Sequence, residues 1–193
     1  MISVFKRKST NLFEPLGKAN QIKVLRIVFP DFELCKHGED FLKFERLEEL
    51  FVQSDIMQPD LLPEEVGRLK TLSKLHILNF RYKEFPRWIF NLKNVRSLML
   101  RGNDIEKIPN EISQLTKLEK LRIENCALTE LPFSFIRLDK LKYLSLSDNS
   151  KLTTLSADNL PRSLKVINLT ASGVNVKTLK AIETRLPKLK VSL

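Results

Sequence analysis

The stretch VRSLMLRGNDIEKIPNEISQLTKLEKLRIENCALTELP (residues 95–132) contains one short pattern twice. Its apolar positions and its proline return after 23 residues, in the pairs Leu98 and Leu121, Leu100 and Ile123, and Pro109 and Pro132. Self-similarity at a fixed period of 20 to 50 residues is typical of repeat architectures, in which one structural unit is stacked many times.

The same pattern extends in both directions from this stretch. Prolines with the 23-residue spacing are Pro63, Pro86, Pro109 and Pro132. Five apolar columns keep the same step: Val66, Ile89, Ile112, Phe135; Leu69, Leu92, Leu115, Leu138; Leu72, Val95, Leu118, Leu141; Leu75, Leu98, Leu121, Leu144; and Ile77, Leu100, Ile123, Leu146. With 25-residue steps the columns reach back to Phe41, Phe44, Leu47, Leu50, Val52 and then Ile22, Leu25, Ile27, and they continue forward to Leu164, Ile167, Leu169 and Leu186, Leu189, Val191. Eight LxxLxL cores therefore cover residues 22–193.

Each unit predicts a short strand followed by a short helical turn. The LxL part alternates, so two apolar side chains point to one face and their neighbours to the other. The segment PNEISQLTKL (residues 109–118) spaces its apolar residues by three, which suits a short helix or 3₁₀ turn packed back on the strand. One unit cannot bury both stripes alone, so the period predicts a stacked solenoid with a parallel sheet on its inner face.

The units resemble the leucine-rich repeat family. VRSLMLRGNDIEKIP (residues 95–109), LEKLRIENCALTELP (118–132) and LKYLSLSDNSKLTTL (141–155) are similar to its LxxLxLxxNxLxxLP consensus, over roughly residues 22–193. The likeness is to the 23-residue, LP-containing intracellular class found in Ras-pathway scaffolds and many bacterial proteins. It implies an α/β solenoid: a right-handed superhelix with a concave parallel β-sheet of about eight strands and short helical, 3₁₀ or irregular segments on the convex side.

The resemblance also implies a role for Asn103, Cys126 and Asn149, which occupy the consensus Asn-or-Cys position. In the family this side chain bonds the turn backbones of adjacent coils. Elsewhere in the chain the column contains Pro30, Asp55, Phe80 and Ser172. We therefore expect irregular turns in the first three units.

The domain organisation follows from the extent of the repeats. Residues 1–20 are expected to act as an improvised N-terminal cap, and residues 21–193 to form one leucine-rich repeat domain of seven repeats and a final partial one. Residues 174–186 have apolar spacings of three and four, which predict a true helix, and the last residues predict a strand. Lys188 and Lys190 belong to that edge strand, and charged residues there hinder its pairing with a strand of another chain. We therefore expect a monomer or weak dimer.

Composition excludes several classes of protein. No run of 18 apolar residues could span a membrane, and no apolar leader follows Lys6, Arg7 and Lys8, so we expect a cytoplasmic protein. Cys35 and Cys126 are too few for a disulfide framework, and the CKH sequence around His37 supplies two ligands where zinc needs three or four. The five glycines form no phosphate-binding motif, and no nucleophile or acid–base constellation is visible. No enzyme activity and no cofactor are expected.

The concave face carries the candidate site. Strand alternation places the residue between the two core leucines, and the residue after them, on that face. Phe51, Leu78 and Met99, with Val28 and Phe29 beside them, predict an exposed apolar patch with a basic rim, the composition of a protein-binding hot spot. The predicted partner-binding residues are Arg26, Val28, Phe51, His76, Leu78, Met99, Arg101, Arg122 and Glu124.

Three functions are compatible with this surface. The first is a non-catalytic interaction module whose partner is a protein with an acidic or polar group. The second is a surface that binds nucleic acid or another polyanion, suggested by a net charge of +10, although Glu49, Asp104, Glu124 and Asp148 interrupt the basic residues. The third is the recruiting half of a bacterial effector ubiquitin ligase, but no segment outside the repeats is long enough for the catalytic domain. The first is preferred and nucleic acid is not expected.

Overall fold

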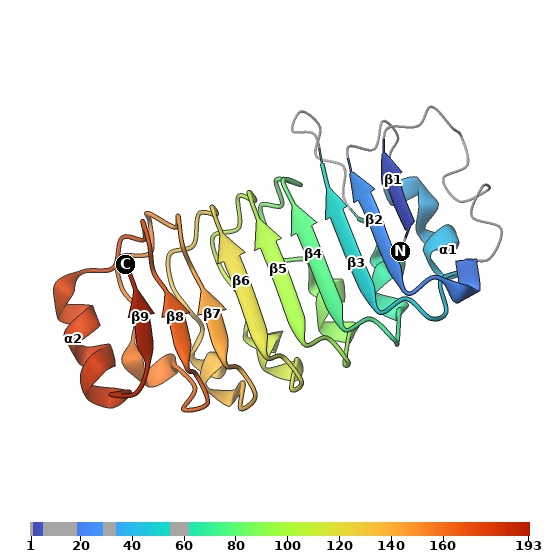
Figure 1. The fold of residues 1–193 in the computed structure, drawn as a ribbon. Helices are drawn as coiled ribbons and strands as arrows, with labels where there is room; N and C mark the ends of the chain where they lie inside the picture. The colour runs from blue at the N-terminus through green and yellow to red at the C-terminus, as the bar shows by residue number, and fades with distance from the viewer. Residues whose placement is uncertain (1, 6–18, 29–33, 55–61) are drawn as a thin grey trace.

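The computed structural model describes residues 2–5, 19–28, 34–54 and 62–193, and within them the strands form one parallel sheet. The nine strands pair in the order of the sequence (Figure 1). Their bounds are β1 (Ile2–Phe5), β2 (Val24–Val28), β3 (Glu49–Gln53), β4 (Lys74–Leu78), β5 (Ser97–Arg101), β6 (Lys120–Glu124), β7 (Tyr143–Ser145), β8 (Val166–Asn168) and β9 (Lys190–Ser192). The predicted α/β solenoid is thereby confirmed, with one strand more than the eight repeat cores supply.

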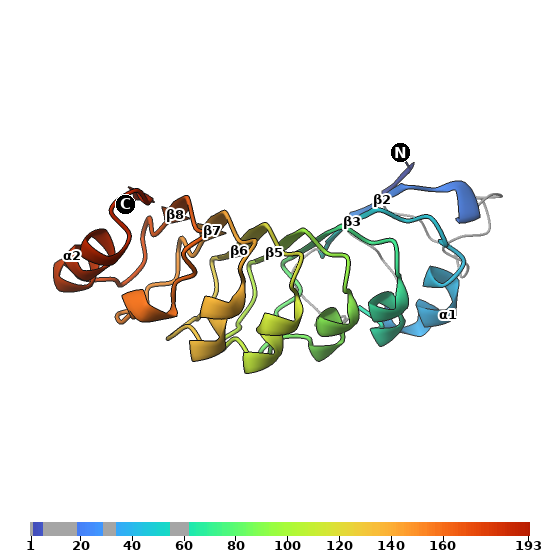
Figure 2. The same cartoon turned by 90° about the horizontal axis from the view of Figure 1, so that it is seen from below.

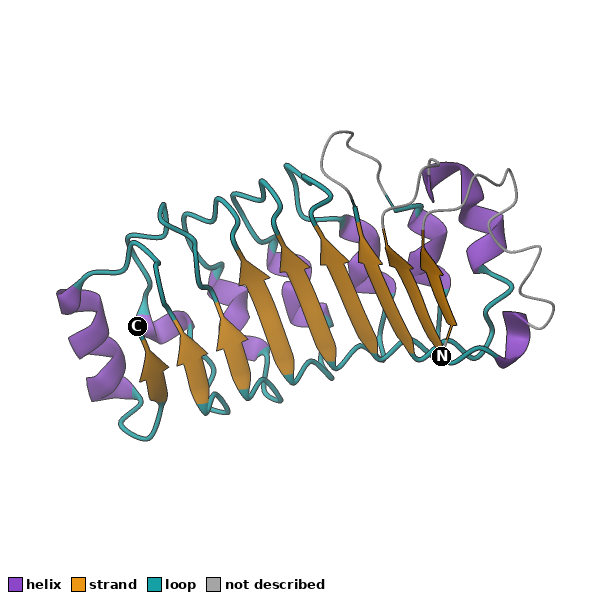
Figure 3. Cartoon of the chain, turned by 45° about the horizontal axis from the view of Figure 1, so that its top comes forward, coloured by secondary structure: helices purple, strands orange, loops and turns teal. Residues whose placement is uncertain are grey.

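Short helical turns cover the convex side of this sheet, and the sheet itself lines the inner side of a shallow bow (Figure 2). Figure 3 shows the same segregation of strands and helices. The 3₁₀ turns are η2 (Ala19–Gln21), η3 (Leu34–His37), η4 (Glu64–Arg68), η5 (Arg87–Asn91), η6 (Asn110–Gln114), η7 (Phe133–Arg137) and η8 (Ala157–Asn159). The α-helices are α1 (Gly38–Phe41) and α2 (Val176–Arg185), the second of which confirms the helix predicted for residues 174–186.

The repeating prolines begin the regular convex turns. Pro63, Pro86, Pro109 and Pro132 each stand directly before a 3₁₀ turn with φ between −65° and −68°. Proline has this φ built in and has no N–H that the start of a helix would leave unsatisfied. Each proline carbonyl accepts a hydrogen bond of 3.0–3.1 Å from the N–H three residues later. The 23-residue proline column thus fixes where every regular turn starts.

The core lies between the sheet and these turns. The leucine, isoleucine and valine columns predicted from the sequence are buried along β2 to β8, and Val66, Ile89, Ile112 and Phe135 from η4 to η7 are buried with them. Trp88 is also buried, at 8% exposure, and its backbone packs against Gly67, where an added Cβ would lie 2.7 Å from the Trp88 carbonyl oxygen. The apolar face of each strand and that of each turn, which one unit could not bury alone, are therefore buried by the stacking of neighbouring coils.

The ladder column acts as the resemblance implied. Asn149 is fully buried, and its amide nitrogen donates to the carbonyls of Ile123, Leu146 and Ser147 at 2.7–3.1 Å. Its Oδ1 accepts from the backbone N–H of Leu128 at 3.1 Å. Asn103 Oδ1 likewise accepts from Tyr82 N at 3.2 Å. These side chains thus provide hydrogen-bond partners for backbone N–H and C=O groups of the turns that have no partner inside their own coil.

The residue before each ladder position adopts a left-handed backbone. Positive φ values of 48–65° recur every 23 residues at Asn79, Gly102, Asn125, Asp148 and Ala171. Glycine, asparagine and aspartate tolerate this conformation, whereas an alanine such as Ala171 is strained by about 1 kcal/mol. The left-handed residue turns the chain out of the strand and aims the next side chain into the core.

Both ends of the sheet depart from the sequence interpretation. At the N-terminal end, residues 2–5 form β1, which pairs with β2 in the register Ile2 to Leu25 and extends the sheet. Residues 1 and 6–18 of the expected cap lie outside the described residues, as do Phe29, Pro30 and Asp55.

At the C-terminal end, the expected register of the last core is wrong by two residues. Ile167 pairs with Val191, not with Leu189, and Asn168 pairs with Ser192, not with Lys190. The reason is α2, whose ten residues replace a five-residue 3₁₀ turn and use more chain before the strand begins. Leu189 is left in the turn, where it packs on the core partly buried.

Candidate functional site

The concave face consists of three rows of side chains that run across the strands. The middle row, between the two core positions, is Arg26, Phe51, His76, Met99, Arg122, Ser145, Asn168 and Ser192. The row at the strand ends is Val28, Gln53, Leu78, Arg101 and Glu124. The row at the strand starts is Val24, Glu49, Lys74, Ser97, Lys120, Tyr143, Val166 and Lys190.

All nine predicted partner-binding residues lie on five adjacent strands, β2 to β6. The half-buried ones are Val28, Phe51, His76, Leu78, Met99 and Glu124, and the exposed ones are Arg26, Arg101 and Arg122. The apolar patch is therefore partly shielded by its own neighbours and not fully open as expected. Its residues form one continuous surface, whose role in binding stays a prediction.

Aromatic contacts organise the N-terminal half of this surface. The guanidinium carbon of Arg26 lies 5.4 Å from the centre of the Phe51 ring, within range of a cation–π contact. On its other side, Phe51 meets His76 edge to face, with 6.1 Å between ring centres and 70° between planes. Three neighbouring strands thus present one ordered group of flat side chains.

A second cationic group lies on β5 and β6. The Arg122 guanidinium carbon is 5.2 Å from the centre of the Tyr143 ring, and its Nε is 3.9 Å from Glu124 Oε1. Arg101, one strand away, is exposed and makes no ion pair within the described part of the chain. The guanidinium of Arg101 is therefore available to a carboxylate or carbonyl from outside.

The row at the strand starts was missed in the sequence analysis. It includes Lys74, whose Nζ lies 2.7 Å from the Glu49 carboxylate on the neighbouring strand, and Tyr143, which packs under Arg122. The signal was present, because strand alternation also exposes the residue just before the first core leucine.

The electrostatic potential at the centre of the face is positive. Burial lowers the pKa of His76, and the charges of Lys74, Arg122 and Arg26 lower it further, against an opposing effect of Glu49. His76 is consequently neutral at pH 7, where its ring can donate one hydrogen bond and accept another. An acidic partner would be attracted to this potential, since it brings negative charge next to several cations.

His76 gives a measurable pH dependence. Its pKa is lower in the folded protein than the ordinary value of about 6.5 in the unfolded chain, so the unfolded chain binds more protons in the interval between them. We expect stability to increase as the pH rises through this interval and to be lost as it falls.

Arg122→Gln should raise the pKa of His76, because it removes a neighbouring positive charge. The pKa can be measured by NMR from the Cε1 proton of His76. Arg137→Gln on the convex side should not change it, and an unchanged value in Arg122→Gln would contradict the positive potential.

The C-terminal half of the concave face has small side chains. Ser145 is fully buried and Ser147 is 8% exposed, and Ser145 Oγ has no hydrogen-bond partner among the residues that the structure describes. Beyond them, Asn168 Oδ1 accepts from both the backbone N–H and the hydroxyl of Thr170. Small polar side chains therefore replace here the aromatic and arginine residues of β2 to β6.

The residues considered for chemistry have structural surroundings. Burial raises the pKa of Cys126 to about 11, and its Sγ lies 3.4 Å from the Glu124 carbonyl oxygen, so it remains an unreactive thiol in the ladder column. His37 Nδ1 lies 3.0 Å from the Asp40 carboxylate, and the Cys35 side chain falls outside the described residues. Among the side chains that are described, no group of three or more His, Cys, Asp or Glu could hold a metal ion. No helix in that part of the chain is long and apolar enough to cross a membrane.

Comparisons with known proteins agree with the fold. A structure of a leucine-rich repeat protein from Leptospira interrogans superposes with a TM-score of 0.77 at 26% sequence identity, covering 98% of this chain and 47% of that one. The functional domain of InlJ from Listeria monocytogenes, which includes a cysteine ladder, has a TM-score of 0.64 at 15% identity over 90% of this chain and 35% of its own. The leucine-rich repeat domain of the type III effector XopL has a TM-score of 0.64 at 20% identity over 90% of this chain and 69% of its own.

The chain spans about half the length of the Leptospira protein. A search of curated proteins finds no match. The model of the family described as "Leucine-rich repeat region" matches residues 87–192, more than half of the chain. The match begins at η5 and ends in β9, and it includes the Asn103, Cys126 and Asn149 ladder positions. From this match and from the repeated coils described above, the chain belongs to the leucine-rich repeat family.

Proposed function

We propose that this protein is a non-catalytic interaction module that binds a protein partner on the concave face of β2 to β6. The observation that supports this best is one continuous surface of half-buried Phe51, Leu78 and Met99 beside the exposed guanidinium groups of Arg26, Arg101 and Arg122. Aromatic residues, methionine and arginine are the types enriched in the cores of protein interfaces. The fold supports the same general function, since leucine-rich repeats serve widely as interaction scaffolds.

The chemistry of the surface also suggests the kind of partner. Arginine recognises a carboxylate through two parallel hydrogen bonds, which gives both direction and charge complementarity. Among the described residues Arg101 has no ion pair, and the ion pair of Arg122 with Glu124 is a long one of 3.9 Å. We therefore propose a partner that places an acidic or strongly polar group at β5 and β6 and an apolar side chain at β3 and β4.

Nucleic acid is not proposed as the ligand. The Glu49 carboxylate neutralises Lys74 on the concave face, and Glu124 stands beside Arg122. A backbone of closely spaced phosphates would meet these carboxylates as well as the cations. The positive net charge of the chain is thus not gathered into a continuous basic stripe on this face.

The proposed function is tested with two phenylalanines on opposite faces of the molecule. Phe51 lies on the concave face, and Phe133 is 67% exposed at the start of η7 on the convex side. Affinity capture from the native cell extract, with partners identified by mass spectrometry, should recover a protein with the unmodified chain. Phe51→Ala should lose that partner, because removal of an aromatic anchor at an interface centre costs about 2 kcal/mol or more of binding.

Phe133→Ala is the matched control, since it removes the same side chain from the other face. It should retain the partner, and circular dichroism should show that both variants are folded. Retention of the partner by Phe51→Ala together with its loss in Phe133→Ala would move the binding site to the convex side and contradict the proposal.

A further inference from the structure

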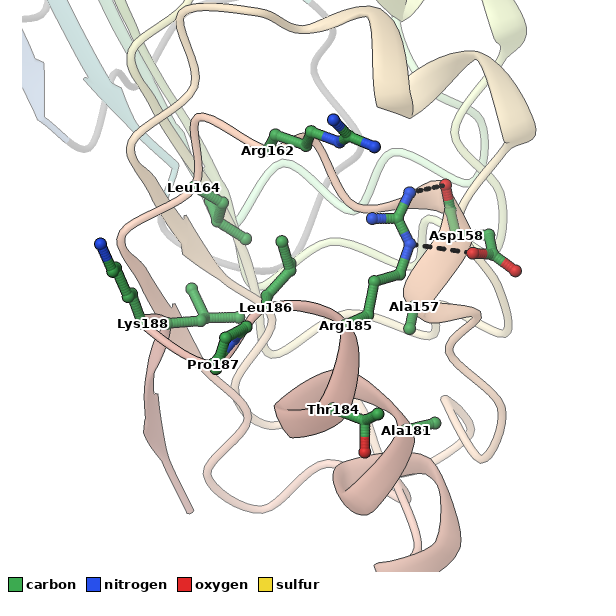
Figure 4. A pocket seen from close by; sticks show the side chains of 11 residues that line it. Ala157, Asp158, Arg162, Leu164, Ala181, Thr184, Arg185, Leu186, Pro187 and Lys188 are labelled. Atoms are coloured by element: carbon green, nitrogen blue, oxygen red, sulfur yellow. Dashed lines mark hydrogen bonds and ion pairs between the residues drawn. The ribbon is translucent and has the colours of Figure 1, made fainter.

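A separate pocket lies on the convex side at the C-terminal end of the solenoid. It has a volume of about 890 Å³ and opens between η8, α2 and the turn of residues 186–189 that leads into β9 (Figure 4). The α-helix α2 replaces the 3₁₀ turn of the preceding coils, and β9 pairs one residue later than the 23-residue step predicts, with Val191 opposite Ile167. The last coil consequently does not repeat the close stacking of its neighbours, and the pocket forms where the period changes.

The floor of this pocket is apolar. Ala157 and Leu164 are buried at 9% and 5% exposure, while Leu186 and Leu189 pack on the core and remain partly exposed. Ala181 faces the pocket from α2. An apolar side chain from a partner would be removed from water here without displacing any polar group of the floor.

The rim of the pocket is cationic. Three basic side chains line it, Arg162, Arg185 and Lys188, against a single carboxylate, Asp158. Arg185 Nε donates to Asp158 Oδ1 at 2.8 Å and its Nη2 donates to the Asp158 carbonyl oxygen at 3.5 Å, so Asp158 holds the guanidinium in place. Arg162 and Lys188 are exposed, and among the described residues no ion pair is formed by either.

We propose that this pocket binds an acidic peptide segment of a partner protein, with an aliphatic side chain on the floor and flanking carboxylates at Arg162 and Lys188. Charge complementarity favours an acidic ligand, since three basic side chains line the rim and only one carboxylate does. The position of the donors favours a peptide. A small metabolite is normally enclosed with several fixed polar contacts, whereas here the charges stand on an open rim and suit carboxylates presented by a chain lying across it.

The test uses three capped pentapeptides, GELEG, GQLQG and GEGEG, titrated into the full chain and followed by NMR. GELEG should shift the amide signals of Ala157, Ala181 and Leu189 and leave those of β3 to β5 unchanged. GQLQG lacks the charges and GEGEG lacks the aliphatic side chain, so each should bind at least several-fold more weakly. No shift at the pocket, equal binding of GQLQG, or the same shifts with sodium acetate would each overturn the proposal.

Variants separate the site from general charge attraction. Arg162→Gln and Lys188→Gln should each weaken GELEG binding by roughly threefold to fivefold, the size expected for contacts between exposed charges. Lys70→Gln removes the same charge from an exposed position near η4 and should leave binding unchanged. Ala181→Glu introduces a carboxylate next to the cationic rim and should compete with the peptide. Equal weakening by Lys70→Gln would contradict a defined site.

Discussion

Replacing Leu121 with aspartate is expected to unfold the central coils of the protein. Leu121 is fully buried in β6, in register with Leu98 on one side and Leu144 on the other. The substitution removes a core side chain, which alone costs about 2 to 5 kcal/mol, and adds an unpaired carboxylate in its place. Since each coil is stabilised mainly by its neighbours, the damage should spread to β5 and β7. Urea unfolding followed by circular dichroism measures the loss.

Lys120→Asp is the control for this variant. Lys120 is the adjacent residue, but strand alternation places it on the concave face, where it is exposed. A surface change of this kind is expected to alter stability by no more than about 0.5 kcal/mol. Similar unfolding curves for the two variants would contradict the assignment of Leu121 to the core face of the sheet.

Asn149→Ala is expected to have the next largest effect. Asn149 makes four hydrogen bonds from a fully buried position, and its removal leaves the Leu128 N–H and the Ile123 carbonyl without this partner. Each unsatisfied buried group costs about 1 to 3 kcal/mol, so we expect a loss of roughly 3 kcal/mol in the free energy of unfolding. Thermal and urea unfolding would measure it.

Two comparisons make this second prediction specific. Cys126→Ala changes the same column one coil earlier, but the contacts of the thiol with the Glu124 and Leu100 carbonyls are long, at 3.4 and 3.8 Å. Its loss should cost about 1 kcal/mol, because sulfur is both a weak donor and a weak acceptor. Asn110→Ala, at an exposed position, should be close to neutral. If Asn149→Ala were no more costly than Asn110→Ala, the ladder would not stabilise the turns.

The predictable parts of the fold are those in which the spacing of residues along the sequence directly determines their positions in the structure. A 23-residue proline column fixes the start of every regular turn, and LxL alternation fixes which side chains enter the core. The nine candidate residues fall on five adjacent strands for the same reason. Phe80 replaces the ladder asparagine, and its coil places the ring in the core, fully buried and stacked on Tyr82.

The parts that were missed depend on contacts that periodicity does not encode. The register of β9 is set by the length of α2, which a pattern of apolar residues alone does not fix to within two residues. The partial shielding of Phe51 depends on where the Arg26 guanidinium lies, a matter of side-chain conformation. The convex pocket arises from a change of helix type between neighbouring coils, and it joins residues 157–164 and 181–189 that no motif connects.

The order of strands in the sheet has a consequence for how the protein is made. Strands β2 to β9 pair in the order in which a ribosome would release them, so each new coil adds to an edge that is already formed. At translation rates of about 5 to 20 residues per second, a 23-residue coil emerges roughly every one to five seconds, far longer than local structure needs to form. The nascent chain can therefore fold coil by coil from its N-terminal end. At any moment little more than one coil then exposes its apolar side chains to the cell.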